Sequence, residues 1–291
     1  MIRIDQKKCI LCRKCVDVCP SKIFVWKSLK GEAKQVEIEY QELCILCGHC
    51  VAICPENAVL HDRLPIQLFT PLESVKITAE ALRKLMLSRR SIRAYKPKPV
   101  PRIVLEQLLE VAIHAGTASN RQDIAFTVVQ DKKILVKLET EVLLTLWNRL
   151  KRLGNPFFRR LARIKYGDSN IQAYDRYYNV FKRRMEIKEH LSDIILRGAP
   201  AVIILHTLGK HILDAANCAL AIANMTGLAQ AMGLGVCWGG FVIEAAHQTL
   251  RINKILEIPT SRKIMGCLMI GYPKHQYLKM IPRNQPKVKW L

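Results

Sequence analysis

The stretch CILCRKCVDVCP at residues 9–20 recurs at residues 44–55 as CILCGHCVAICP, a repeat with a period of 35 residues. In both copies the cysteines follow the spacing C-x-x-C-x-x-C-x-x-x-C, and a proline comes directly after the last cysteine. Three of the eleven cysteines, Cys218, Cys237 and Cys267, lie outside these copies. A disulfide scaffold would be short and rich in cysteine throughout, so this clustering predicts metal ligands in a reducing compartment.

The spacing is typical of four-iron cubanes, in which each iron takes one thiolate. Three cysteines two residues apart wrap one cluster from a single loop, and the fourth cysteine, after three more residues, points to the other cluster. Zinc is the alternative, but a zinc site would need only four cysteines in two pairs. We therefore expect two 4Fe–4S clusters with crossed ligation, the first on Cys9, Cys12, Cys15 and Cys54 and the second on Cys19, Cys44, Cys47 and Cys50.

The cysteine repeat defines a small N-terminal domain. Between its two copies, short strands are expected at Ile23–Trp26 and Gln35–Tyr40, around a turn at Lys30-Gly31. Residues 1–62 as a whole resemble bacterial two-cluster ferredoxins. Residues 63–78 contain two prolines and little periodicity, so we place a linker there.

The second domain, residues 79–291, is expected to mix helices and strands, which predicts an α+β layered architecture. Residues 139–197 within it are expected to form a helical, basic and aromatic-rich insertion that acts as a lid over the substrate. The periodicity predicts helices at Ala81–Leu87, after Pro101 and at Asp214–Met232, and strands at Ile124–Gln130, Ala201–His206 and Ile264–Tyr272.

Four segments of this second domain carry candidate binding residues. The first, RRSIRAY at residues 89–95, places three guanidinium groups and a hydroxyl at the end of a helix, and this set suits a phosphate dianion. The second, AGTASNRQD at residues 115–123, is a polar loop between a helix and a strand. The third, MGLGVCWGG at residues 232–240, has glycines that let a backbone approach a flat ring closely. The fourth is Gly271-Tyr272-Pro273, followed by Arg283.

Each segment alone has an ordinary explanation, such as a solvated basic face, a polar turn or a glycine-rich turn. Together, in this order and spacing, they resemble the FMN-dependent nitroreductase family over most of residues 79–291, although Gly116 and Asp123 stand where the family has prolines. The resemblance implies a nitroreductase-like FMN-binding fold, a mixed sheet flanked by helices, and a homodimer with flavins at its interface. It implies FMN contacts from Arg89, Arg90, Ser91, Arg93, Thr117, Ser119, Asn120, Gln122, Cys237, Trp238, Gly239, Gly240 and Arg283.

These features predict an FMN-dependent reductase. It would pass electrons from a one-electron donor through the two clusters to FMN, and on to an electron-poor small molecule such as a nitroaromatic, quinone or enone. No catalytic side chain is expected, because FMN carries the chemistry. NAD(P)H is an alternative donor, although no G-x-G-x-x-G follows a strand. The alternative function is an electron-transfer adaptor without small-molecule turnover of its own.

Net charge and hydropathy indicate which classes of partner the protein can have. The formal net charge is +22. The electrostatic field of such a charge attracts an acidic electron carrier such as ferredoxin or flavodoxin. No nucleic-acid motif is found, so no nucleic-acid partner is expected. The longest clean apolar run, Ala199–Leu205, falls far short of the ~20 residues of a membrane span, and no secretory signal is found. We expect a cytoplasmic protein without a transmembrane segment; docking of Leu146–Tyr166 on a membrane surface is an alternative.

For two further residues, a purely structural role and a functional role are both considered. His49, inside the second cysteine motif, is expected to be a loop residue rather than a proton-linked tuner of the cluster. Cys237, in the glycine-rich segment, is expected to be a small buried thiol rather than a reactive one.

Overall fold

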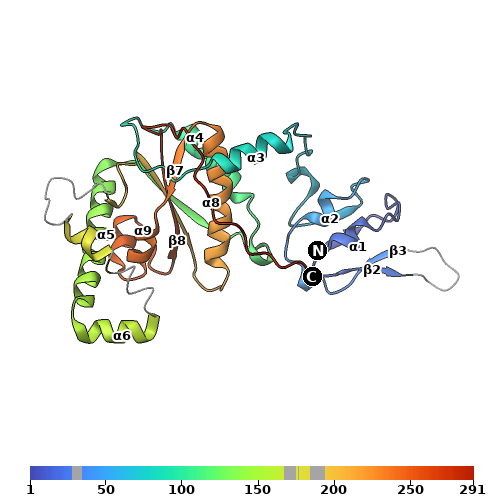
Figure 1. Cartoon of the computed structure of the whole chain (residues 1–291). Helices are drawn as coiled ribbons and strands as arrows, with labels where there is room; N and C mark the ends of the chain where they lie inside the picture. Colours follow the sequence, from blue (N-terminus) through green and yellow to red (C-terminus); the bar gives the residue numbers. More distant parts are fainter. Residues whose placement is uncertain (28–34, 167–174, 176, 184–193) are drawn as a thin grey trace. The chain divides into compact units, whose positions relative to one another are not determined.

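The computed structural model describes residues 1–27, 35–166, 175, 177–183 and 194–291 (Figure 1). The chain forms two compact units, one of Met1–Ile77 with Thr117–Arg121 and one of Thr78–Gly116 with Gln122–Leu291. The expected turn at Lys30-Gly31 and part of the expected insertion lie outside the described residues.

The first unit holds two small antiparallel sheets, in which β1 pairs with β4 and β2 pairs with β3. The strands expected between the cysteine copies are confirmed as β2 and β3. Each copy of the cysteine repeat contains one short helix, which follows its first two cysteines. The elements are β1 (Ile2–Ile4), α1 (Lys14–Val18), β2 (Phe24–Lys27), β3 (Gln35–Ile38), η1 (Gln41–Leu43), α2 (His49–Ala52), β4 (Val59–His61) and η2 (Ile66–Leu68).

The 35-residue repeat is also a repeat of backbone conformation. Leu11 and Leu46, the second residues after the first cysteine of each copy, both have a positive φ, of 58° and 56°. Arg13 and Gly48, two positions later, also share this left-handed conformation. The duplicated sequence therefore follows the same path twice.

Cysteines form part of the core of the first unit. Cys15, Cys19 and Cys50 are buried and pack with apolar side chains such as Phe24 and Val51. A core this small is marginal without a further constraint. Because metal binding couples to folding in such units, we expect the fold to depend on its clusters.

The second unit is built around a four-stranded sheet in the order β5-β6-β8-β7, with antiparallel neighbours throughout. The helices and strands expected from periodicity are confirmed within a few residues at each end. Its elements are α3 (Ala79–Ser88), α4 (Arg102–Ile113), β5 (Ala125–Val129), α5 (Lys132–Leu153), α6 (Pro156–Tyr166), β6 (Ala201–Thr207), α8 (Asp214–Ala231), β7 (Gly235–Trp238), α9 (Gly240–Ala246), α10 (Arg251–Ile255) and β8 (Lys263–Gly271). The short η3 (Ala118–Asn120) belongs to the first unit.

Helices cover both faces of this sheet (Figure 1). Successive residues of a strand point to opposite faces, and on β6 Val202 and Ile204 pack with α5, α9 and α10, whereas Ile203 and Leu205 pack with α4 and α8. Every residue of β6 is buried, which explains its continuous apolar run. None of the described helices combines the length and hydropathy needed to cross a membrane.

The expected insertion begins inside a core helix. Residue 139, where the insertion is expected to start, lies inside helix α5. This helix begins at Lys132, where the Asp131 carboxylate caps it by accepting from Lys133 N and Ile134 N. Its side chains Leu138 and Val142 are fully buried in the core. Helix α6, which follows a break at Gly154, presents apolar side chains to solvent, among them Phe157 and Ile164.

A buried histidine on β6 makes this unit sensitive to acid. His206 Nδ1 accepts from Arg262 Nε at 2.8 Å, and its Nε2 lies 3.1 Å from Thr127 Oγ1. Nδ1 is an acceptor, so the proton sits on Nε2 and the ring is neutral. Burial and, next, the charge of Arg262 lower the pKa of His206 from 6.5 to about 4.

We expect acid to destabilise the second unit through His206. Below pH 6.5 this histidine binds a proton in the unfolded chain, whereas in the folded chain it stays neutral down to about pH 4. The free energy of unfolding therefore falls by about 2 kcal/mol between pH 7.5 and 5. Urea unfolding of wild type and His206→Gln at both pH values measures this effect. The variant should lose that part of the pH dependence, whereas His114→Gln, at an exposed position, should keep it. An unchanged pH dependence in His206→Gln would contradict the assignment.

Candidate functional site

The eight cysteines of the first unit gather around two hollows. Cys9, Cys12, Cys15 and Cys54 line one, and Cys19, Cys44, Cys47 and Cys50 line the other. Each hollow thus combines three cysteines of one copy with the last cysteine of the other copy, the grouping that crossed ligation requires. In the described part of the chain, no three His, Cys, Asp or Glu side chains are arranged to hold a single metal ion. Thiolates spaced around a hollow fit a cubane, and their ligation of clusters stays a prediction.

Backbone N–H groups donate to the cysteine sulfurs. Leu46 N donates to Cys44 Sγ at 3.4 Å, and Ala58 N donates to Cys54 Sγ at 3.2 Å. Gly48, with φ of 73°, helps the second loop turn inward, since glycine adopts this conformation at little cost. Such N–H···S bonds stabilise negative charge on the sulfurs.

Burial raises the pKa of the Cys15 thiol to about 11, and it raises the pKa of Cys50 equally. Backbone N–H groups of Val16 and Val51 partly oppose this effect. Cluster ligands are thiolates, so cluster assembly on these buried cysteines must release protons.

His61, the last residue of β4, also lines the second hollow. Its side chain is buried, and its Nε2 lies 3.7 Å from Cys44 Sγ. Its Nδ1 accepts from the backbone N–H groups of Arg63 and Leu64, each at 3.2 Å. Burial and, next, the positive N-terminus lower the pKa of His61.

In the second unit, three of the four segments that carry the family resemblance meet through backbone pairing. Ser91 forms a parallel bridge with Val236 of β7, and Ile92 N donates to Val236 O at 2.9 Å. Further along, Tyr95 forms an antiparallel bridge with Pro273, just beyond β8. The segment after α3 is therefore held between the glycine-rich segment and the Gly-Tyr-Pro segment.

Gly235 permits this close approach. A Cβ at this position would lie 2.6 Å from the Ile92 side chain, a distance that no relaxed contact allows. The glycine-rich segment thus serves packing against the arginine-rich segment as well as any ligand.

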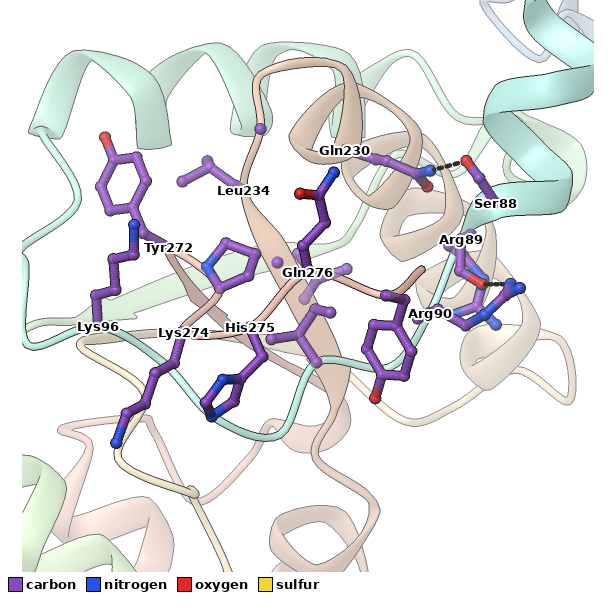
Figure 2. Close-up of a pocket in the computed structure, with 16 residues that line it drawn as sticks. Ser88, Arg89, Arg90, Lys96, Gln230, Leu234, Tyr272, Lys274, His275 and Gln276 are labelled. Atoms are coloured by element: carbon purple, nitrogen blue, oxygen red, sulfur yellow. Dashed lines mark hydrogen bonds between the residues drawn. The ribbon is translucent and has the colours of Figure 1, made fainter. Parts of the chain in front are cut away.

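A cationic hollow of about 550 Å³ opens between the end of α3, β7 and the residues after β8. Its lining includes Arg89, Arg90, Lys96 and Lys274 and no carboxylate. Figure 2 shows the two arginines on one side of the hollow and the two lysines on the other. Arg90 Nη1 donates to Leu87 O at 3.0 Å, but its buried Nε has no partner among the described residues. This concentration of positive charge, with one buried guanidinium nitrogen left without a partner, suits a phosphate dianion.

A second hollow, of about 570 Å³, shares Arg89, Gln230 and Val236 with the first. The rest of its lining is mainly apolar, with Ser91 and Thr226 as polar exceptions, and contains no carboxylate. Apolar residues of this hollow include Leu82, Leu85, Met86, Ile222, Cys237, Trp238 and Leu268. Apolar walls beside a cationic end fit the ring and phosphate of FMN, so the residues present suit that group.

The structure brings together part of the predicted FMN set. Arg89, Arg90, Ser91, Cys237 and Trp238 line these hollows, with Cys237 buried as expected. Four other predicted residues do not line either hollow. Two of these four are arginines with exposed side chains, and the second arginine lies near the C-terminus. These four are Arg93, Gly239, Gly240 and Arg283.

The predicted loop at residues 117–122 is divided between the units. Thr117, Ser119 and Asn120 belong to the first unit and Gln122 to the second. Asn120 Nδ2 donates to the carbonyl oxygens of Ile45 at 3.2 Å and Leu46 at 2.8 Å, in the second cysteine loop. Contact of this loop with FMN therefore stays a prediction.

Sequence reasoning missed several lining residues. Lys274, which directly follows the Gly-Tyr-Pro segment, lines the cationic hollow, whereas the sequence pattern favours Arg283 as the basic residue. Thr226 and Gln230 are polar positions four residues apart on the mainly apolar helix α8, a spacing that places them on one face. Gln230 Nε2 donates to Leu85 O at 2.9 Å and ties α8 to α3.

Known proteins are similar to about two thirds of the chain or slightly more. A curated protein of Archaeoglobus fulgidus named "Putative NADH dehydrogenase/NAD(P)H nitroreductase" is 23% identical over 195 residues, covering 66% of this chain and 86% of that protein. A nitroreductase of Bacteroides fragilis, solved with bound FMN, is 21% identical with a TM-score of 0.54, covering 72% of this chain and 98% of its own. A nitroreductase of Desulfitobacterium hafniense, also with bound FMN, is 20% identical with a TM-score of 0.53 and the same coverage. These solved structures show the shared fold.

Two family models match the chain in separate places. The 4Fe–4S dicluster domain matches residues 8–59, which contain all eight cysteines of the repeat. The nitroreductase family matches residues 86–272, well over half of the chain. The protein therefore belongs to the nitroreductase family and has the fold of that family, preceded by an N-terminal dicluster domain.

Proposed function

We propose that this nitroreductase-family oxidoreductase takes electrons from ferredoxin or flavodoxin, passes them through two 4Fe–4S clusters to FMN, and reduces an electron-poor small molecule. One observation carries the proposal: a single chain combines two four-cysteine hollows with a cationic and an apolar hollow that share Arg89. The relatives solved with bound FMN support the choice of flavin.

The chain's own residues would bind and orient the flavin. Arg89 and the orphaned Nε of Arg90 would hold the phosphate, and Lys96 and Lys274 would add positive charge from the opposite side. When bound, FMN supplies the ability to accept electrons singly and release them as a pair. The apolar walls of the second hollow would exclude water from the ring, which strengthens every polar contact there.

The substrate proposed is a flat, electron-poor molecule such as a nitroaromatic, quinone or enone. Trp238 supports this class, because its ring lines the apolar hollow and is 43% exposed, so that it offers a surface for stacking. The hollow has no carboxylate in its lining and would tolerate negative charge on such a substrate.

The proposed donor is an acidic one-electron carrier, because the chain has a formal charge of +22. We also propose a homodimer. Support comes from α3, whose side chains Leu82, Met86 and Leu87 are 45%, 68% and 44% exposed, an apolar surface suited to burial against a second copy. Light scattering of the purified protein tests this state.

Anaerobic purification and donor assays test the function. We expect about eight irons, about eight sulfides and about one FMN per chain. Reduced ferredoxin or flavodoxin should bleach the flavin absorption faster than NADPH does, in a reaction slowed by salt because opposite charges attract. An acceptor should then reoxidise the protein in repeated turnovers. Protein without iron or flavin would contradict the proposal, and reduction without turnover on any acceptor would indicate the adaptor function instead.

A further inference from the structure

The second cluster site has a ring nitrogen aimed at one of its sulfurs. His61 Nε2 lies 3.7 Å from Cys44 Sγ, within the range of an N–H···S hydrogen bond. The side chain is 6% exposed, so water does not compete for this contact. The contact joins residues 17 positions apart and depends on the end of β4 lying beside the second cysteine loop.

The tautomer of His61 follows from its other nitrogen. Nδ1 accepts two backbone hydrogen bonds, from Arg63 N and Leu64 N at 3.2 Å each. A ring nitrogen that accepts carries no proton, so the proton of the neutral imidazole sits on Nε2. Nε2 is therefore a donor, and it faces Cys44 Sγ.

Among the described residues, none with a ring that could donate to a sulfur lines the first hollow. The residue 35 positions before His61 is Trp26, which pairs with Val36 on the β2–β3 hairpin and does not line the first hollow. The aliphatic residues Ile4 and Val36 line that hollow instead. The two halves of the unit therefore differ at this position, where, in the described part of the chain, only the second hollow has a histidine ring in its lining.

We infer that His61 is a tuning residue for the second cluster, whose Nε2–H donates to the Cys44 thiolate and raises the reduction potential of that cluster alone. Reduction adds negative charge that spreads over the cluster sulfurs, so a donor to a sulfur stabilises the reduced form more than the oxidised form. The second cluster would then hold an electron in preference to the first. The inference rests on the cluster half of the proposed function and is independent of its flavin half.

Redox titration followed by electron paramagnetic resonance tests this role in full-length protein purified without oxygen. In His61→Leu, one cluster should lose about tenfold in its ratio of reduced to oxidised form at a given ambient potential, which equals about 59 mV for one electron. The other cluster should not change. His61→Gln, whose amide can still donate, should restore part of the shift, and His49→Gln, at an exposed position of the same motif, should leave both clusters unchanged.

Iron content separates the two ways in which this test can fail. If the wild type and every variant lack iron, the prediction that this chain binds clusters is wrong. Variants with wild-type iron and unchanged potentials, or with an equal shift of both clusters, overturn the role of His61. If His61→Leu assembles no cluster, pulsed electron paramagnetic resonance of reduced wild-type protein with ¹⁵N-labelled histidine decides the question. Coupling of one cluster to a histidine nitrogen that is lost or altered in His61→Gln supports the role. Absence of this coupling in the wild type overturns it.

Discussion

Cys54→Ser is expected to abolish the cluster of the first cysteine copy, although Cys54 belongs to the second copy. Cys54 lines the same hollow as Cys9, Cys12 and Cys15, whereas Cys44, Cys47 and Cys50 surround the other one. A cubane deprived of one thiolate loses the ligand of one iron. We expect a site with only three thiolates to lose its whole cluster, so iron should fall from about eight to about four per chain, with the second cluster retained.

Thiol alkylation followed by mass spectrometry identifies which cluster has gone. In Cys54→Ser, Cys9, Cys12 and Cys15 should become reactive while the ligands of the second cluster stay protected. Cys19→Ser is the matched control, because it should expose Cys44, Cys47 and Cys50 instead. The opposite pattern, with each variant exposing the cysteines of its own copy, would show that ligation is not crossed.

Arg89→Gln is expected to weaken FMN binding by roughly thirtyfold, since a hydrogen bond to a charged group contributes about 2 kcal/mol. Arg89 lines both the cationic and the apolar hollow. The described residues that line these two hollows include no carboxylate that could pair with its guanidinium. The substitution keeps a polar side chain, although a shorter one, and removes its charge.

Titration of flavin-free protein with FMN and with riboflavin separates phosphate recognition from ring binding. The affinity for FMN should fall in Arg89→Gln, while the affinity for riboflavin, which has no phosphate, should change little. Arg102→Gln is the matched control, because Arg102 is exposed and pairs with Glu106 on α4 at 2.7 Å, outside both hollows. Equal losses for the two flavins would show that Arg89 supports the fold of the hollow rather than the phosphate.

The two halves of the chain differ in how much their sequence revealed. The cysteine spacing predicted which four cysteines gather in each hollow, because the reach of a short loop decides which sulfurs can share a cluster. The arginine-rich segment and the glycine-rich segment were recognised by composition and order. Their meeting at the Ser91–Val236 bridge joins residues far apart in the sequence, which no local pattern encodes.

Two elements show where local patterns failed. The four residues of β7 were interpreted as part of a glycine-rich turn, because a strand this short carries no readable alternation. The sequence predicts a helical insertion from residue 139 onward, but it gives no sign that this residue lies inside a helix that begins at Lys132 and buries Leu138 in the core. Tertiary packing decided both cases.

The amino-acid sequence alone determined the duplicated cysteine loops and the chemistry of a phosphate-binding arginine segment, since both depend on residue types at short, fixed spacing. Only the tertiary structure decided that His61 faces Cys44, that Asn120 holds the second cysteine loop, and that Lys274 joins Arg89 around one hollow. These relations depend on which atoms meet after distant segments pack, and packing is a property of the whole fold.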